Sequence, residues 1–115
     1  MRVIKIDAEN KIVIEMEIEE SDKLSKMQAV VGGLIEIAYE LDNNDTVFVN
    51  EEGLFCDPKN FFEIKGGHQP FAGNGIVVGH NPKTGDSKSV ESSLADIQAR
   101  IKFLTIDEVR KKYDF

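Results

Sequence analysis

The sequence predicts an α+β domain: an antiparallel sheet of about five strands, with one short helix and a C-terminal helical segment packed on it. Three observations support this prediction. Residues alternate between apolar and polar over 11–20, apolar residues recur at helical spacing from Leu24 to Val31, and turn residues separate further short apolar runs. The 115 residues fit a single domain, with an expected core of about 2–90 and a helical extension of about 91–115.

The N-terminal segment is predicted to form a β-hairpin. Two runs typical of strands, residues 2–6 and 11–20, flank a turn composition at residues 7–10. The strict alternation of the second run predicts one buried face and one acidic face in water. The predicted buried face holds Ile12, Ile14, Met16 and Ile18, and the acidic face holds Val13, Glu15, Glu17 and Glu19.

A short helix is predicted next, over residues 21–31. Ser21 is the expected N-cap, because its hydroxyl can accept hydrogen bonds from the free amides of the first turn. Apolar residues then recur at helical spacing as far as Val31. We expect Gly32 to end this helix, since glycine adopts the left-handed conformation without a Cβ clash, and Gly33 to let the chain reverse.

A second hairpin is predicted from residues 34–41 and 46–49, which flank the polar turn 42–45. Residues 50–53, with the sequence Asn-Glu-Glu-Gly, are expected to close the returning strand as a turn. The glutamates of this turn have two interpretations. They either face water while the asparagine and glycine set the backbone geometry, or they are presented to a ligand or partner.

The middle of the chain predicts one helical turn, one glycine-rich loop and one central strand. The helical turn is expected within residues 57–62, and the loop over residues 66–75. The apolar run 76–78 is typical of a central strand. Residues 81–86 have the composition of a turn, across which residues 87–90 can pair back.

Two short helices are predicted after residue 90. The first is an amphipathic helix marked by apolar residues at spacings of three and four: Leu94, Ile97, Ile101 and Leu104. The second is expected to begin at Thr105, because Thr105 and Glu108 match a capping box.

The charge of the chain is −7 and is unevenly distributed. Residues 1–56 carry five Lys or Arg against thirteen Asp or Glu, whereas residues 57–115 carry nine against eight. Because phosphate backbones are bound by Lys and Arg, the acidic first half argues against general nucleic-acid binding. No apolar run approaches the roughly 18 residues needed to span a bilayer, so no membrane contact is expected. Cys56 is the only cysteine, which fits a reducing compartment, and a cytoplasmic location is expected.

The sequence lacks the usual residue patterns of catalytic, cofactor and metal sites. The glycines at 73 and 75 precede an apolar strand, whereas a dinucleotide fingerprint places them between a strand and a helix. His68, His80 and Cys56 do not have the spacing of a zinc site. We therefore expect no catalytic residue, no metal and no cofactor.

The candidate binding residues lie at the two glycine-containing joints and on the acidic strand. Backbone geometry explains the glycines, but it does not require the glutamates beside them. These candidates are Gly32, Gly33, Glu36, Asn50, Glu51, Glu52, Gly53, Glu15, Glu17 and Glu19.

The order and spacing of these motifs resemble a family of uncharacterised small domains that is common in bacteriophages, plasmids and other mobile elements. The resemblance covers about residues 2–90 and depends on Val-Gly-Gly-x-Ile-Glu at 31–36 and Asn-Glu-Glu-Gly at 50–53. Gly75, Val77, Val78 and Gly79 match the later strand. The resemblance implies an accessory protein in the cytoplasm of a bacterial host cell, and it transfers no catalytic residue. The tail after residue 90 is longer than the family leads us to expect.

Three functions remain open from the sequence. The first is a non-catalytic binding module acting on a host protein, suggested by the acidic strand. The second is a protein that binds or sequesters a small molecule such as a nucleotide signal. It is suggested by the backbone amides of the glycine-containing segments 32–33 and 66–75, which can hold phosphate. The third is a hydrolase using Glu51, Glu52 and one histidine. A homodimer through the exposed edge of the N-terminal hairpin is a further expectation.

Overall fold

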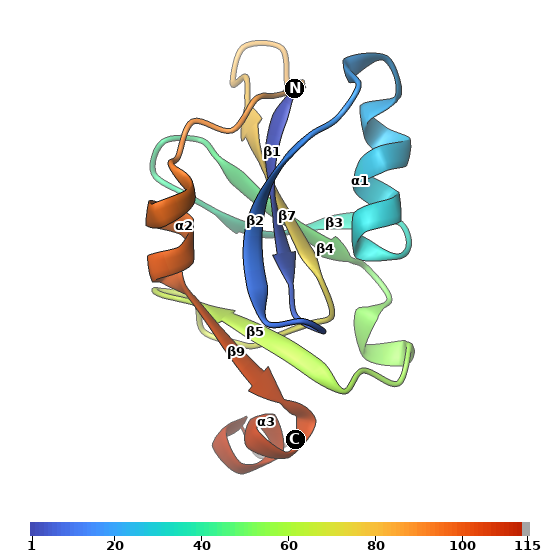
Figure 1. Cartoon of the computed structure of the whole chain (residues 1–115), viewed down its shortest axis with the longest axis vertical. Coiled ribbons are helices and arrows are strands. Elements are labelled where there is room, and N and C mark those ends of the chain that lie inside the picture. The colour runs from blue at the N-terminus through green and yellow to red at the C-terminus, as the bar shows by residue number, and fades with distance from the viewer. Residues whose placement is uncertain (114–115) are drawn as a thin grey trace.

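The structure, a computed structural model, describes residues 1–113 and confirms the α+β class (Figure 1). The last two residues of the predicted extension 91–115 lie outside the described residues. The elements in chain order are β1 (Arg2–Asp7), β2 (Ile12–Glu17), η1 (Glu20–Asp22), α1 (Lys23–Val31), β3 (Ile35–Glu40), β4 (Thr46–Asn50), η2 (Gly53–Phe55), β5 (Asn60–Ile64), β6 (Phe71–Ala72), β7 (Gly75–His80), β8 (Ser87–Lys88), α2 (Leu94–Arg100), β9 (Ile101–Thr105) and α3 (Ile106–Tyr113).

The main antiparallel sheet has the strand order β2-β1-β7-β4-β3, with the short β8 paired to β7. Both predicted hairpins are present, as β1–β2 and β3–β4. The predicted central strand is β7, which lies between β1 and β4. Its residues Ile76, Val77 and Val78 are fully buried. Helix α1 covers one face of β7, and residues of α2, β5 and β6 cover the other. Because both faces of β7 are buried, a continuous apolar run is needed there.

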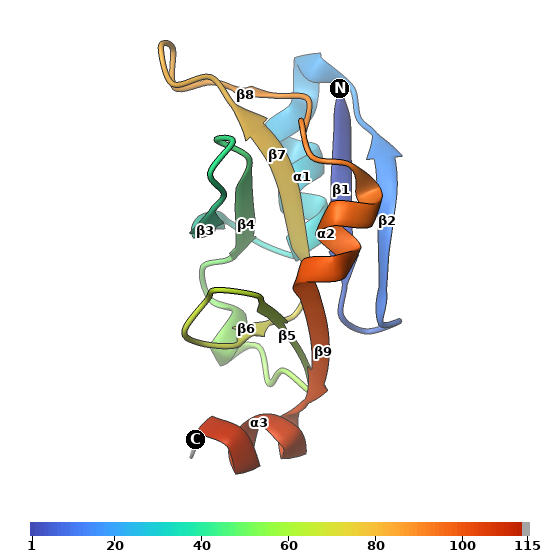
Figure 2. The same ribbon diagram turned by 90° about the vertical axis from the view of Figure 1, so that its left-hand side faces the viewer.

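A second sheet, not expected from the sequence, has the order β6-β5-β9 and lies at the end of the molecule opposite the N-terminus (Figures 1 and 2). Phe61 and Phe62 belong to β5, so the predicted helical turn over 57–62 is wrong. Phe62 packs into the core shared with the main sheet, where its ring lies 5.5 Å from that of Phe71. Phe61 is buried on the opposite face, together with Val109 of α3.

The segment after residue 90 also differs from its prediction. The amphipathic helix ends at Arg100, and Ile101–Thr105 form β9, which pairs with β5 from Ile64↔Ile101 to Asn60↔Thr105. Pairing between distant segments here overrides the local helical spacing. The predicted capping box is confirmed, because the amide of Thr105 donates to the Glu108 carboxylate at 3.0 Å and the amide of Glu108 donates to the Thr105 hydroxyl at 3.2 Å.

The buried face of β2 is the reverse of the prediction over its first half. Val13 is buried, whereas Ile12 and Ile14 are 45% and 38% exposed. Helix α2 packs against β2 on the Val13 side, where the Gln98 side chain donates to the Val13 carbonyl at 3.1 Å. Helix α1 lies over β7, β4 and β3 instead, so the opposite side of β2 is left partly open.

The beginning of α1 differs from its prediction and its end agrees. Ser21 lies in the η1 turn, and the helix begins at Lys23 without a side-chain cap. Gly32 adopts the left-handed conformation at the C-cap, with φ +85°. The amides of Gly32 and Gly33 both donate to the Gln28 carbonyl, at 2.8 and 3.1 Å.

Asp45, at the end of the turn between β3 and β4, is fully buried. Its carboxylate accepts from the amide of Glu91 at 3.0 Å and from the amide and hydroxyl of Ser92 at 2.7 and 2.6 Å. This turn therefore fixes the segment that leads into α2.

The edge strand β3 is irregular. Ile37 pairs with Phe48 and Tyr39 pairs with Val47, so a β-bulge falls at Ala38. Over the described residues, no helix is long and apolar enough to cross a membrane.

Candidate functional site

The two glycine-containing joints meet in space. A Cβ built on Gly33 would lie 2.8 Å from Nδ2 of Asn50, so the Asn50 side chain occupies the space that the glycine leaves. The Asn50 side chain also accepts from the amide of Glu52 at 2.9 Å, and the amide of Glu51 donates to the Leu34 carbonyl at 2.9 Å. The end of α1 and the end of β4 are thus one structural joint.

Four of the candidate residues line one small cavity beside this joint. Glu36, Asn50, Glu51 and Gly53 border a cavity of about 150 Å³ together with residues of η2 and β6. A Cβ on Gly53 would lie 3.1 Å from the Ala72 carbonyl oxygen, so this glycine allows η2 to approach β6 closely. Glu52 is exposed beside the cavity.

Apolar side chains are exposed around the same cavity. Ile37 of β3 is 57% exposed, and in η2 Leu54 is 58% and Phe55 is 88% exposed. We call the residues Glu36, Ile37, Glu51, Leu54 and Phe55 the β3–η2 surface. Strand β3 pairs with β4 alone among the strands of residues 1–113, so its outer edge presents unpaired backbone groups. The surface therefore combines a free strand edge with exposed apolar and acidic side chains.

The acidic strand is separate from this surface. Glu15, Glu17 and Glu19 are exposed at the opposite edge of the main sheet, on and just after β2. Glu15 forms an ion pair with Arg2 at 2.7 Å, and Glu17 lies 3.4 Å from the N-terminal ammonium group. The edge on which the predicted homodimer depends is present, and the dimer itself stays a prediction.

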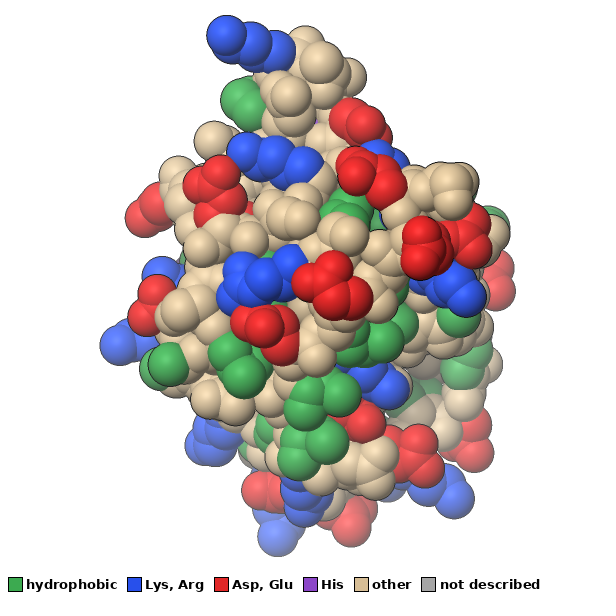
Figure 3. All heavy atoms as spheres, turned by 45° about the horizontal axis from the view of Figure 1, so that its top comes forward, with side chains coloured by type: hydrophobic (Ala, Val, Ile, Leu, Met, Phe, Trp, Pro, Cys, Tyr) green, Lys and Arg blue, Asp and Glu red, His purple; other side chains and the backbone are tan. Residues whose placement is uncertain are grey.

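Charges of both signs are interspersed over the end of the molecule that carries the N-terminus (Figure 3). The ion pairs Lys23–Asp86 and Lys88–Glu91, both at 2.9 Å, belong to this region. Acidic and basic side chains therefore pair with one another in this region.

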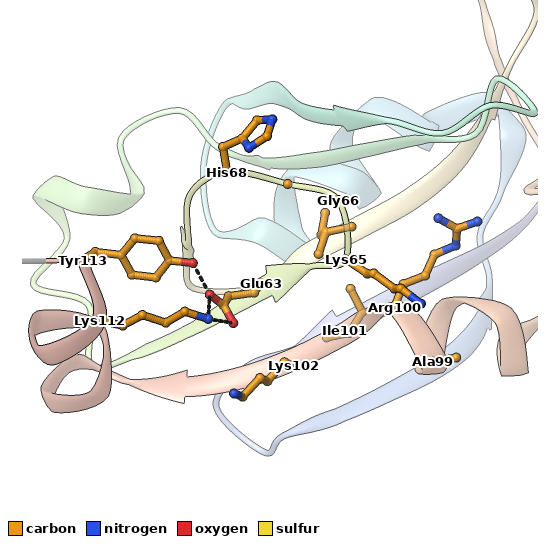
Figure 4. A pocket seen from close by; sticks show the side chains of 12 residues that line it. Glu63, Lys65, Gly66, His68, Ala99, Arg100, Ile101, Lys102, Lys112 and Tyr113 are labelled. Carbon is orange, nitrogen blue, oxygen red and sulfur yellow. Dashed lines mark hydrogen bonds and ion pairs between the residues drawn. The ribbon is translucent and has the colours of Figure 1, made fainter.

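A second cavity, of about 450 Å³, lies where β5, β9 and the last turn of α3 meet (Figure 4). At one end of it the Glu63 carboxylate accepts hydrogen bonds from Lys112 and from the Tyr113 hydroxyl. Burial alone would raise the pKa of Glu63, but these hydrogen bonds outweigh it and hold that pKa below its ordinary value. The hydrogen bond to Glu63 raises the pKa of Tyr113 and that of Lys112.

The same cavity holds residues that the sequence analysis did not single out. Its lining includes Lys65, Arg100, Lys102 and Lys112 beside the turn of Gly66 and Gly67. The excess of basic residues in the second half of the chain was the available signal, but residues so far apart in sequence give no local pattern. His68 lines this cavity and Glu51 lines the cavity of the joint, so these two residues of the hydrolase hypothesis do not share a cavity. Within residues 1–113, no three His, Cys, Asp or Glu side chains form a group that could hold a metal ion.

Comparison with protein families identifies the chain. A family model described as a domain of unknown function, DUF3846, matches residues 1–108. The chain belongs to the DUF3846 family. The match extends beyond residue 90 through α2 and β9, so the part of the tail up to residue 108 belongs to the DUF3846 domain and does not follow it as an addition. Neither the curated proteins nor the solved structures compared with this chain gave a match.

Proposed function

We propose that this DUF3846 chain is a non-catalytic binding module that acts on a host protein, as an accessory protein of a phage or mobile element in the bacterial cytoplasm. The observation that carries the proposal is the free edge of β3 beside the exposed side chains of Ile37, Leu54 and Phe55. An exposed strand edge binds extended segments through backbone hydrogen bonds, and neighbouring pockets select the side chains.

The chemistry of the β3–η2 surface favours one kind of occupant, an extended segment with basic and apolar residues. The apolar side chains of Leu54 and Phe55 favour apolar residues in the partner. Glu36, Glu40 and Glu51 are exposed along the same edge and favour Lys or Arg. A second copy of this chain docked through the same edge would bring like charges together, which is unfavourable.

The test is binding of a labelled peptide that alternates lysine and valine, compared with a peptide that alternates glutamate and valine. We expect the basic peptide to bind with a Kd below about 1 mM and to shift the amide resonances of β3. Glu36→Lys and Phe55→Ser should each weaken binding by about tenfold or more. Leu24→Ser is the matched control, because Leu24 is 54% exposed on α1, away from the surface.

The proposal is wrong if both peptides bind equally, or if the shifts fall on β2 and not on β3. The variants Glu15→Lys, Glu17→Lys and Glu19→Lys separate these cases, because they change the same charge at the opposite edge. Capture of a protein from host lysate by wild-type chain, and its loss with Glu36→Lys, would then identify the partner.

A further inference from the structure

The cavity between β5, β9 and α3 has an unusual charge for this molecule. The chain as a whole carries −7, yet four cations line this cavity against the single carboxylate of Glu63. That carboxylate accepts hydrogen bonds from Lys112 and from the Tyr113 hydroxyl at one end of the cavity (Figure 4). Lys65, Arg100 and Lys102 form no ion pair within residues 1–113, although the charge of Lys102 acts on Glu63 from nearby.

Lys65 and Arg100 are held next to each other by the sheet. Ile64 pairs with Ile101 at the end of the β5–β9 ladder, and the amide of Lys65 donates to the Arg100 carbonyl at 2.8 Å, so these two residues are neighbours just beyond that end. Two like charges held close together repel each other, and an anion beside both of them relieves that repulsion. Neither side chain forms a hydrogen bond or ion pair within the described residues, and Figure 4 shows both at the end of the cavity away from Glu63.

The turn beside the two cations is built from two glycines, Gly66 and Gly67. Gly66 follows Lys65 directly and has φ +93°, a conformation that side chains rarely adopt. A Cβ on Gly66 would also lie 2.8 Å from the Tyr39 hydroxyl, so the turn requires glycine here. An adjoining cavity is lined by Lys65, Gly66, Ala99 and Arg100, with Asp96 as its one acidic residue.

We propose that this cavity binds a small phosphate-bearing ligand, with Lys65 and Arg100 as the groups that hold the phosphate. An arginine guanidinium and a lysine ammonium together match the geometry and charge of a phosphate group. The volume of about 450 Å³ is within the range of small-molecule sites. The negative charge of the remaining molecule does not prevent this, because charges beyond about 8 Å are largely screened at physiological salt. The site is independent of the β3–η2 surface.

The test is titration of the full chain with adenosine monophosphate, inorganic phosphate and adenosine, followed by amide resonances. Both phosphates should shift Lys65, Gly66 and Arg100, and adenosine should not. Lys65→Gln combined with Arg100→Gln should raise the Kd of adenosine monophosphate by about tenfold or more, and so should an increase in salt. Both side chains are exposed, so the variant is expected to fold, which thermal unfolding checks.

The control is Lys26→Gln, an exposed lysine on α1 that should leave binding unchanged. No shift with either phosphate at about 10 mM would overturn the proposal, since such a site would have a Kd well above the millimolar range. Equal binding by the double variant would overturn it as well. Binding of single-stranded nucleic acid without binding of the mononucleotide would also overturn it, in favour of a nucleic-acid site.

Discussion

Two carboxylates, Asp45 and Glu63, each fasten a C-terminal part of the chain to a sheet, and they do so under different conditions. Asp45 is fully buried and accepts from backbone amides and a hydroxyl of residues 91–92. Glu63 is 14% exposed and accepts from Lys112, which is 51% exposed, and from Tyr113. Neutral partners in a buried site thus fix a conformation, whereas a charged partner at the surface forms a weaker contact that depends on salt and pH.

The largest effect is expected from removing the buried carboxylate. Asp45→Ala leaves the amides of Glu91 and Ser92 without partners, which should lower the free energy of unfolding by about 3 kcal/mol or more. Urea denaturation measures it. Asp42→Ala, on an exposed residue of the same turn, is the control and should change stability by less than about 0.5 kcal/mol. Equal effects of the two substitutions would contradict the role assigned to Asp45.

The joint between α1 and β4 fastens two segments of the chain without any carboxylate. Gly33→Ala places a Cβ against the Asn50 side chain and should cost about 2 kcal/mol. In an Asn50→Ala background the same substitution should cost much less, since the obstructing side chain is gone. A double-mutant cycle by urea denaturation measures this coupling, and additive effects would exclude it.

A smaller effect is expected from one of the Asp45 hydrogen bonds. Ser92→Ala removes the hydroxyl, which donates to Asp45 and also accepts from the Asn43 side-chain amide at 2.9 Å, and it keeps the backbone amide of residue 92. The loss should therefore be about 1–2 kcal/mol, still below that of Asp45→Ala. Thermal unfolding should show a lower Tm for Ser92→Ala. The comparison variant Ser89→Ala removes only an exposed hydrogen bond from the amide of Arg2 and should lower the Tm by less. A loss as large as that of Asp45→Ala would mean that the hydroxyl, and not the amides, carries the contact.

The smallest effect is expected at Glu63, and it depends on pH. The folded pKa of Glu63 lies below its ordinary value of 4.5, so its contribution is present above that pH and is lost as the pH falls through the folded pKa. Glu63→Gln should therefore reduce stability by no more than about 1 kcal/mol at pH 7 and flatten the stability curve at acidic pH. Unfolding measured from neutral to acidic pH at low and high salt checks both. A steep acid dependence that persists in Glu63→Gln would assign it to other carboxylates.

The parts of the fold that follow from local patterns could be predicted from the sequence. Hairpins, the glycine C-cap at Gly32 and the capping box at Thr105 each depend on a few neighbouring residues. The sheet formed by β5 and β9 could not be predicted, because its stability comes from pairing between Phe61 and Leu104, residues distant in sequence. The buried face of β2 depends likewise on where α2 packs, which alternation alone does not specify.

The candidate site was predictable to a similar extent. Glu36 and Glu51 can be predicted from local sequence because they lie close to Gly33 and Gly53, and both line one cavity in the structure. The apolar part of the β3–η2 surface was missed, because the sequence does not show that Phe55 is left exposed. The cationic cavity was missed because Lys65 and Arg100 become neighbours only through the pairing of β5 with β9.

The bulge at Ala38 affects whether copies of this chain aggregate through the edge of β3 at high concentration. A regular, flat edge accepts one strand after another and so templates open-ended aggregates. The register shift between Ile37 and Tyr39 interrupts the edge of β3 and leaves only a short regular stretch beside η2. The bulge thus shortens the regular part of this edge, which disfavours edge-to-edge polymerisation through β3.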